Sequence, residues 1–145
     1  MSDRRIRLLL IEDELLNRAL VHATLTRAED PRLRDAELVE APTIAEGRRA
    51  LEDGRFDVLL LDVRLPDGNG LELATSLREP RPLMVAMTAS VVPSPRDLAM
   101  EAGCDGFLEK PFQPRDLQAV LTRLLDGLVP RLTQLTGVIE GRRPR

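Results

Sequence analysis

The sequence predicts an α/β protein built on a doubly wound, five-stranded parallel sheet. Three observations support this fold class. Short apolar runs occur without the alternation of a half-exposed strand, stretches with helical spacing separate them, and the two kinds of segment alternate about five times. Continuous apolar strands are typical of a parallel sheet that helices cover on both faces. The alternation indicates βα units with right-handed crossovers.

Five segments are expected to form the strands. The clearest are IRLLLI, DVLLLD and PLMVAM, at residues 6–11, 57–62 and 82–87. Weaker candidates of similar length are AELVEA at 36–41 and GFLEK at 106–110. All five are as long as ordinary strands in globular proteins.

Apolar residues recur at helical spacing between these strands, and we expect each stripe to face the sheet. The first stripe consists of Leu15, Leu16, Ala19, Leu20 and Ala23; the second of Leu73, Ala74 and Leu77; the third of Leu117, Val120, Leu121, Leu124 and Leu125. Pro114 opens the third stripe and Gly127 stops it. Two prolines in VVPSPRD, residues 91–97, predict a late start for the fourth helix. DPRLRDAE, residues 30–37, makes a long connection before the second strand.

Composition limits the classes of function. The 145 residues suit one domain, and the formal charge of −3 argues against non-specific binding of nucleic acid. Three Phe and no Trp or Tyr argue against a base-stacking surface. A single cysteine, Cys104, cannot form an internal disulfide. The apolar run near the N-terminus is too short for a membrane span, so we expect a cytoplasmic protein without a membrane partner.

The carboxyl ends of the predicted strands carry the residues with chemical potential. Glu12 and Asp13 follow the first strand, Asp62 ends the third, Thr88 the fourth and Lys110 the fifth. The ends of parallel strands share one edge, where doubly wound folds place their sites. Clustered carboxylates call for a cation, and oxygen ligands suit magnesium. A divalent cation on one side and an ammonium group on the other would leave a place for a tetrahedral anion. Such an arrangement suits phosphoryl transfer, in which a carboxylate can itself be the nucleophile.

Four motifs carry a resemblance to a known family: IEDE at 11–14, LLLDVRLPDGNGLEL at 59–73, MTAS at 87–90 and FLEKPF at 107–112. Together, in this order and at fitting spacings, they resemble the CheY-like receiver domain of two-component response regulators. The resemblance covers roughly residues 5–127. It implies a flavodoxin-like arrangement of the sheet and a phosphoprotein that acts in signal transduction or a phosphorelay.

The resemblance implies a role for each acidic residue at this edge. Asp62 matches the phospho-accepting aspartate. Glu12 and Asp13 match the acidic pair that holds Mg²⁺ together with Asp62, and the backbone carbonyl of Arg64 would complete the protein ligands.

The remaining motif residues match the parts that respond to the phosphoryl group. Thr88 and Lys110 would contact the new anion, and Thr88 with Phe107 would form the switch. Arg64 and Ser90 occupy the positions that tune phosphoryl lifetime. The family also implies a cis peptide bond between Lys110 and the following proline.

The function implied is acceptance of a phosphoryl group from a sensor histidine kinase or a histidine-phosphotransfer protein, followed by a conformational signal to a downstream protein target. Such a protein is a phosphoacceptor with at most slow self-dephosphorylation rather than an enzyme, and homodimers are compatible with it. EDELLNR, residues 12–18, resembles receivers of hybrid kinases. Enzyme alternatives lack their motifs: there is no P-loop, no G-x-G-x-x-G, and Arg64 replaces the second acid of D-x-D phosphatases.

One alternative of a different class stays open: a receiver-shaped interaction module that works without phosphorylation. Its usual sign is loss of the aspartate, the lysine or the acidic pair, and this sequence keeps all of them. We expect residues 1–127 to form the receiver, and residues 128–145 a tail with a short helix and a disordered end. The sequence leaves open the cognate kinase, the target, the stimulus, and whether the chain stands alone or was cut from a larger protein.

Overall fold

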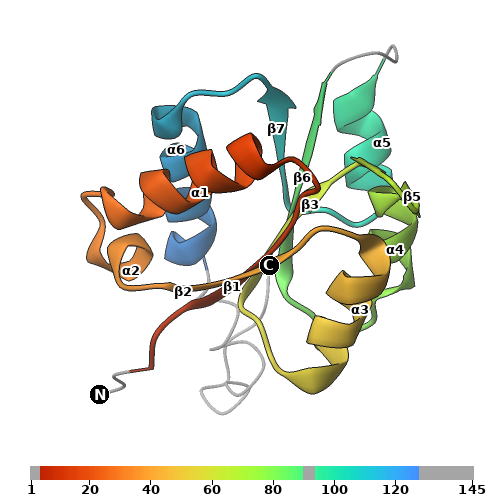
Figure 1. Cartoon of the computed structure of the whole chain (residues 1–145), viewed down its shortest axis with the longest axis horizontal. Helices are drawn as coiled ribbons and strands as arrows, with labels where there is room; N and C mark the ends of the chain where they lie inside the picture. Colours follow the sequence, from red (N-terminus) through yellow and green to blue (C-terminus); the bar gives the residue numbers. More distant parts are fainter. Residues whose placement is uncertain (1–3, 90–93, 128–145) are drawn as a thin grey trace, which may run out of the picture.

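Five parallel strands form the central sheet of the computed structural model, which describes residues 4–89 and 94–127. Their spatial order is β2 (Glu37–Ala41), β1 (Arg7–Ile11), β3 (Val58–Asp62), β6 (Leu83–Ala89) and β7 (Gly106–Lys110). β3 therefore lies in the middle of the sheet, with β1 and β6 as its neighbours (Figure 1). The predicted doubly wound parallel sheet is confirmed, and all five strands lie where the apolar runs indicated.

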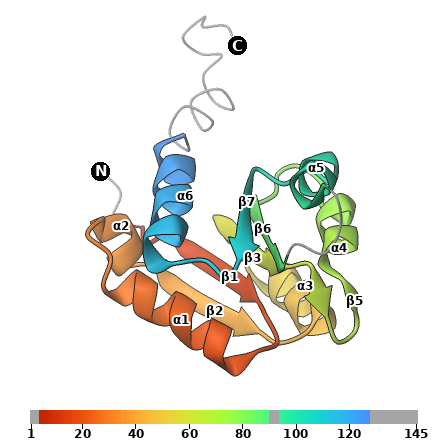
Figure 2. The ribbon, with the colours of Figure 1, turned by 90° about the horizontal axis from the view of Figure 1, so that it is seen from above.

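Helices cover both faces of the sheet. One face carries α1 (Leu15–Thr26), the short α2 (Pro31–Arg34) and α6 (Pro114–Asp126); the other carries α3 (Ile44–Asp53), α4 (Gly70–Ser76) and α5 (Pro95–Glu101). The two layers are separated clearly when the molecule is seen from above (Figure 2). Successive residues of a strand point to opposite faces, so each buried strand contributes to two cores.

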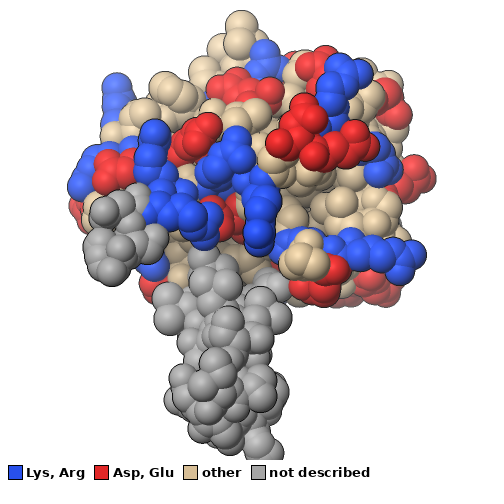
Figure 3. Space-filling view, turned by 90° about the horizontal axis from the view of Figure 1, so that it is seen from below, with Lys and Arg blue, Asp and Glu red and all other residues tan. Residues whose placement is uncertain are grey.

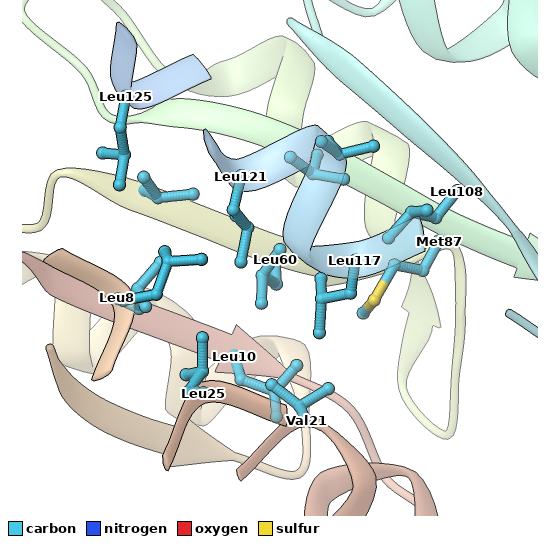
Figure 4. Packing of buried hydrophobic residues seen from close by; sticks show 14 of the residues in the cluster. Leu8, Leu10, Val21, Leu25, Leu60, Met87, Leu108, Leu117, Leu121 and Leu125 are labelled. Carbon is cyan, nitrogen blue, oxygen red and sulfur yellow. The ribbon is translucent and has the colours of Figure 1, made fainter. Parts of the chain in front are cut away.

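The core beneath α1 and α6 is made mostly of leucine. Leu117, Leu121 and Leu125 lie between α6 and the sheet, close to Leu60 and Leu8 (Figure 4). Each is at most 2% exposed, and burial of a leucine side chain contributes about 1.5–3 kcal/mol. The predicted stripe of α6 is therefore confirmed, and it anchors the last helix to the strands that carry the site.

The first predicted stripe is wrong in its rotation about the helix. Leu15 is 69% exposed and Leu16 is 83% exposed, while α1 buries Val21, Thr24 and Leu25 instead. The physical reason is position: α1 begins beyond the carboxyl end of β1, so its first turn has no strand beneath it. Two leucines therefore lie on the surface at the site edge of the sheet.

Two small elements lie in connections for which the sequence pattern predicts no helix or strand. The 30–37 connection contains α2, whose N-terminus is capped because Asp30 Oδ1 accepts from the Arg32 N–H at 2.9 Å. The segment after β3 forms an antiparallel hairpin of β4 (Arg64–Leu65) and β5 (Gly68–Asn69). The late start of the helix after β6 is confirmed, since α5 begins at Pro95.

Charges of both signs are mixed on the face seen in Figure 3. Ion pairs also join segments that are distant in the sequence, such as Arg4 with Asp57 at 2.9 Å and Arg32 with Asp126 at 2.7 Å. Within 4–89 and 94–127, none of the helices has both the length and the apolar character needed to cross a bilayer.

Candidate functional site

Asp62 is the last residue of β3 and is only 5% exposed. The four residues before it in the strand are fully buried, which fixes its height at the carboxyl edge of the sheet. The chain then turns sharply, with Val63 N–H bonded to the Met87 carbonyl at 3.0 Å and Gly70 N–H bonded to the Val63 carbonyl at 2.7 Å. A Cβ at Gly70 would overlap the backbone carbonyl of Asp62, so the close approach of α4 requires glycine there.

Glu12 and Asp13 meet Asp62 at this edge. One carboxylate oxygen of each residue lies within 4.8 Å of those of the other two. Glu12 is 1% exposed, and its backbone N–H donates to the Ala41 carbonyl of β2 at 3.0 Å; Asp13 is exposed. The sequence prediction that these three carboxylates lie together is confirmed.

Lys110 supplies the cation of the site. Its Nζ lies 2.8 Å from Glu12 Oε1 and 3.1 Å from Asp62 Oδ2. The side chain is 17% exposed and extends from the end of β7 past the end of β6. The peptide bond between Lys110 and Pro111 is cis, as the resemblance implied.

The charges of this cluster do not cancel, because acidic groups outnumber basic ones. Burial, together with the charge of Glu12, raises the pKa of Asp62 to about 6, although Lys110 acts in the opposite direction. Burial alone would lower the pKa of Lys110, but its bonds to Glu12 and Asp62 outweigh burial and raise that pKa. Three carboxylates face one ammonium group, so the donor set fits a divalent cation, and an all-oxygen set suits magnesium.

Thr88 and Phe107 lie near this cluster on neighbouring strands. Thr88 is 7% exposed in β6, one position beyond the residue paired with Asp62, and its hydroxyl donates to the Ala89 carbonyl at 3.2 Å. Phe107 lies in β7, half-buried against the core beneath α3, α4 and α5. Their switching role stays a prediction. Ser90 lies outside the described residues.

Arg64 has two parts with different surroundings. Its backbone N–H donates to Asp62 Oδ1 at 3.2 Å. Its side chain is exposed and lines a cavity of about 400 Å³ that Thr88 and Leu98 also border. The metal contact of its carbonyl and its effect on phosphoryl lifetime stay predictions.

Three residues that support the site were missed from the sequence. Asn17 Nδ2 donates to Glu12 Oε2 at 3.3 Å, and Arg18 donates to the backbone carbonyls of Glu12 and Asp13. Both belong to the EDELLNR stretch, and their place four to six residues after the acidic pair, early in the next helix, is the signal that could have found them.

The third missed residue, Asp67, caps α3 from the β4–β5 hairpin. Its two oxygens accept from the N–H groups of Ile44 at 2.9 Å and Ala45 at 3.0 Å. These bonds lower the pKa of Asp67. The hairpin that follows Asp62 is thereby joined to the neighbouring βα connection.

Comparison with known proteins gives a consistent set of similarities. Residues 8–122 match the response regulator receiver domain family. The transcriptional regulatory protein GltR of Pseudomonas aeruginosa is 32% identical over 145 residues, which cover 97% of this chain and 55% of GltR. The chain spans about half, or less, of the length of the curated relatives it matches.

Two solved structures resemble the fold. The receiver domain of the sensor histidine kinase PA1611 from Pseudomonas aeruginosa, solved with a magnesium ion in its active-site cleft, has a TM-score of 0.69 and 27% identity, covering 83% of this chain and 97% of that one. A CheY-like receiver domain protein from Methanospirillum hungatei has a TM-score of 0.73 at 24% identity, covering 90% of this chain and 99% of that one. The second likeness concerns the fold alone.

Proposed function

Because the chain belongs to the response regulator receiver domain family of two-component signal transduction, we propose that it accepts a phosphoryl group on Asp62 and passes the signal on by a conformational change. The observation that carries the proposal is the meeting of Glu12, Asp13, Asp62 and Lys110 at one edge of the sheet. A receiver of this kind is a phosphoacceptor rather than an enzyme with turnover.

The proposed step is a transfer from a phosphohistidine to the carboxylate. The P–N bond of the donor breaks, a P–O bond forms to a carboxylate oxygen of Asp62, and the imidazole leaves with the electron pair and takes up a proton. Asp62 must be ionised to attack. Lys110, already 3.1 Å from the carboxylate, stays protonated and binds the phosphoryl oxygens.

Glu12, Asp13, Asp62 and the backbone carbonyl of Arg64 would hold Mg²⁺. When bound, this ion neutralises the negative charge that gathers on the carboxylates and the transferring group. The fit rests on the chemistry of the three carboxylates, whose oxygens lie within 4.8 Å of one another. The residues contribute position and charge, which is nearly all that phosphoryl transfer demands of a protein.

The donor in this proposal is a sensor histidine kinase or a histidine-phosphotransfer protein. Support comes from Leu15 and Leu16, two exposed apolar residues next to Asp13. Exposed apolar residues beside a site favour contact with another protein. We also propose a cytoplasmic location, where such donors carry their phosphoryl groups.

The output in this proposal is a shift between two packings. Lys110 and the Thr88 hydroxyl bind the new anion, and the inward turn of Thr88 lets Phe107 change its position. Phe107 borders a cavity of about 790 Å³ between α5, β7 and α6, and this face is where we propose that a downstream protein target or a second copy binds. Arg64 and Ser90 would set how long the signal lasts.

The domain assignment is part of the proposal. Residues 1–127 would form the receiver, and residues 128–145 a C-terminal tail that lies outside the described part of the chain.

Incubation with acetyl phosphate and Mg²⁺, followed by intact-mass measurement, tests the proposal. We expect the wild type to gain one phosphoryl mass, Asp62→Asn to gain none, and Asp53→Asn, at the exposed end of α3, to gain it normally. A wild type that stays unmodified, or an Asp62→Asn variant that is still modified, contradicts the proposal. A folded, unmodified wild type is the result expected of the phosphorylation-independent interaction module.

A further inference from the structure

Arg18 joins the loop that carries the acidic pair to two secondary-structure elements. Its Nη1 donates to the backbone carbonyl of Glu12 at 3.0 Å and to that of Asp13 at 3.1 Å. Its Nε lies 3.2 Å from Glu40 Oε1. The guanidinium group, rooted in α1 and paired with β2, therefore holds both main-chain oxygens of the pair.

This contact pattern restrains the pair more than a surface ion pair does. The Arg18 side chain is only 19% exposed, and a planar guanidinium group presents its donors in a fixed fork. Two successive carbonyls bonded to one rigid group cannot rotate independently. The backbone sets the direction of each Cα–Cβ bond, so these contacts fix where the side chains of Glu12 and Asp13 leave the main chain relative to Asp62.

A second contact holds the side chain itself. Asn17 Nδ2 donates to Glu12 Oε2 at 3.3 Å, and the Glu14 N–H donates to the same oxygen at 3.1 Å. The other oxygen, Oε1, meets Lys110. The first turns of α1 thus fix Glu12 at the side chain and at the main chain.

We infer that Arg18 is a positioning residue that aligns Glu12 and Asp13 for the binding of a divalent cation, an inference that rests on the proposed function. Loss of a group that hydrogen-bonds to metal ligands and so orients them commonly weakens metal binding about 10- to 100-fold. Arg18 acts through the backbone of the ligands and touches no carboxylate of the site.

The sign of the effect separates positioning from charge. Removing a positive charge near a cation site makes cation binding tighter by Coulomb's law. Loss of alignment makes binding weaker. A purely structural role would lower the stability of the metal-free protein and leave the affinity of the folded protein for Mg²⁺ unchanged.

The experiment is a Mg²⁺ titration of the intact, ¹⁵N-labelled chain, followed by amide chemical shifts because the sequence has no Trp or Tyr for fluorescence. The variants are Arg18→Gln and, as a matched control, Arg27→Gln at the exposed C-terminal end of α1. All titrations are run at a temperature well below the thermal unfolding midpoint of each metal-free protein, so that only folded protein is compared. We expect Arg18→Gln to bind Mg²⁺ about tenfold more weakly and Arg27→Gln to bind like the wild type.

Glu40→Gln provides a double-mutant cycle. Glu40 is linked to the pair by its ion pair with Arg18. If its effect passes through that contact, the double variant Arg18→Gln/Glu40→Gln should bind Mg²⁺ no more weakly than Arg18→Gln alone. If the two residues acted only through their charges, the changes in Mg²⁺ binding free energy caused by the two single substitutions would add in the double variant.

The outcomes distinguish the inference from the proposed function. Unchanged or tighter binding by Arg18→Gln, or additive effects in the cycle, overturns the inference and leaves the proposed function standing. A wild type that binds no Mg²⁺ overturns the inference too, and phosphorylation of the wild type by acetyl phosphate then decides the proposed function separately.

Discussion

The Lys110 ammonium lies 3.1 Å from the Asp62 carboxylate, across the end of an intervening strand. β6 separates the two strands that carry these residues, so the contact depends on the full length of the lysine side chain. The same nitrogen also reaches Glu12, 98 residues away in the sequence. One cation thereby contacts two buried carboxylates at the ends of the neighbouring strands β1 and β3.

Replacement of Lys110 should therefore destabilise the metal-free protein. Lys110→Met leaves Glu12 and Asp62 buried without a cation, and breaking such a pair costs about 3 kcal/mol. Urea unfolding in the presence of a chelator measures the loss. Addition of Mg²⁺ should recover part of it, and a loss below about 1 kcal/mol in chelator would contradict the buried ion pairs.

Asp62→Asn should stabilise the metal-free protein at neutral pH. The pKa of Asp62 is raised to about 6 from 3.8, so the folded state binds the proton more readily than the unfolded state. Ionisation of this carboxyl therefore costs stability above pH 6, and the cost disappears below about pH 4. We expect a gain of about 1–3 kcal/mol at pH 7.5 that shrinks as the pH falls from 6 to 4.

Unfolding curves of both proteins across this pH range, recorded in chelator, check the prediction. With Mg²⁺ at neutral pH, the stability advantage of Asp62→Asn over the wild type should shrink or change sign, because the cation binds the folded wild type more tightly than the variant. A variant less stable than the wild type at pH 7.5 in chelator would show that Asp62 carries no desolvation cost.

Gly70→Ala should disturb the site through the backbone. The new methyl group overlaps the Asp62 carbonyl, so α4 and the end of β3 must separate, at a cost of about 1–3 kcal/mol. Gly127→Ala is the matched control, because a Cβ at this position meets only atoms at 3.6 Å or more. The free energy of unfolding of this variant should differ from that of the wild type by less than about 0.5 kcal/mol. The unfolding midpoints of the two variants are compared with that of the wild type. We also expect Gly70→Ala, but not Gly127→Ala, to be phosphorylated more slowly than the wild type.

Arg64→Ala should shorten the life of the phosphoryl group. The Arg64 side chain borders the cavity next to Thr88, where a long cation screens the anion and obstructs water. After removal of the phosphodonor, the decay of the phosphorylated mass over time gives the rate for each protein. A rate in Arg64→Ala equal to or slower than that of the wild type excludes this role.

β1, β3 and β6 could be predicted with ease because each is buried on both faces, which leaves a continuous apolar run in the sequence. β2 and β7 are only partly buried, and their runs are correspondingly weaker. The rotation of α1 could not be predicted in the same way. Its sequence offers apolar residues on two faces, and the choice depends on how far the helix extends beyond β1. Leu15 and Leu16 lie past that end and stay exposed.

The charged residues at the strand ends were also predictable, because the topology alone brings them together. The residues that hold these charged residues in position could not be predicted from the sequence. Arg18 binds carbonyl oxygens, which every residue possesses, and Asp67 binds the N–H groups of a helix 22 residues or more before it. Contacts to the main chain leave no complementary side chain in the sequence to indicate them.

The contacts of Lys110 also give the site its own spectroscopic label. Apart from His22, all other basic side chains in this sequence are arginine, and Lys110 is the only lysine among 145 residues. Protein grown on ¹³C-labelled lysine carries that isotope in one side chain, between Glu12 and Asp62. Its single ε-carbon resonance should move when a cation or a phosphoryl group changes the partners of the ammonium, without any substitution in the protein.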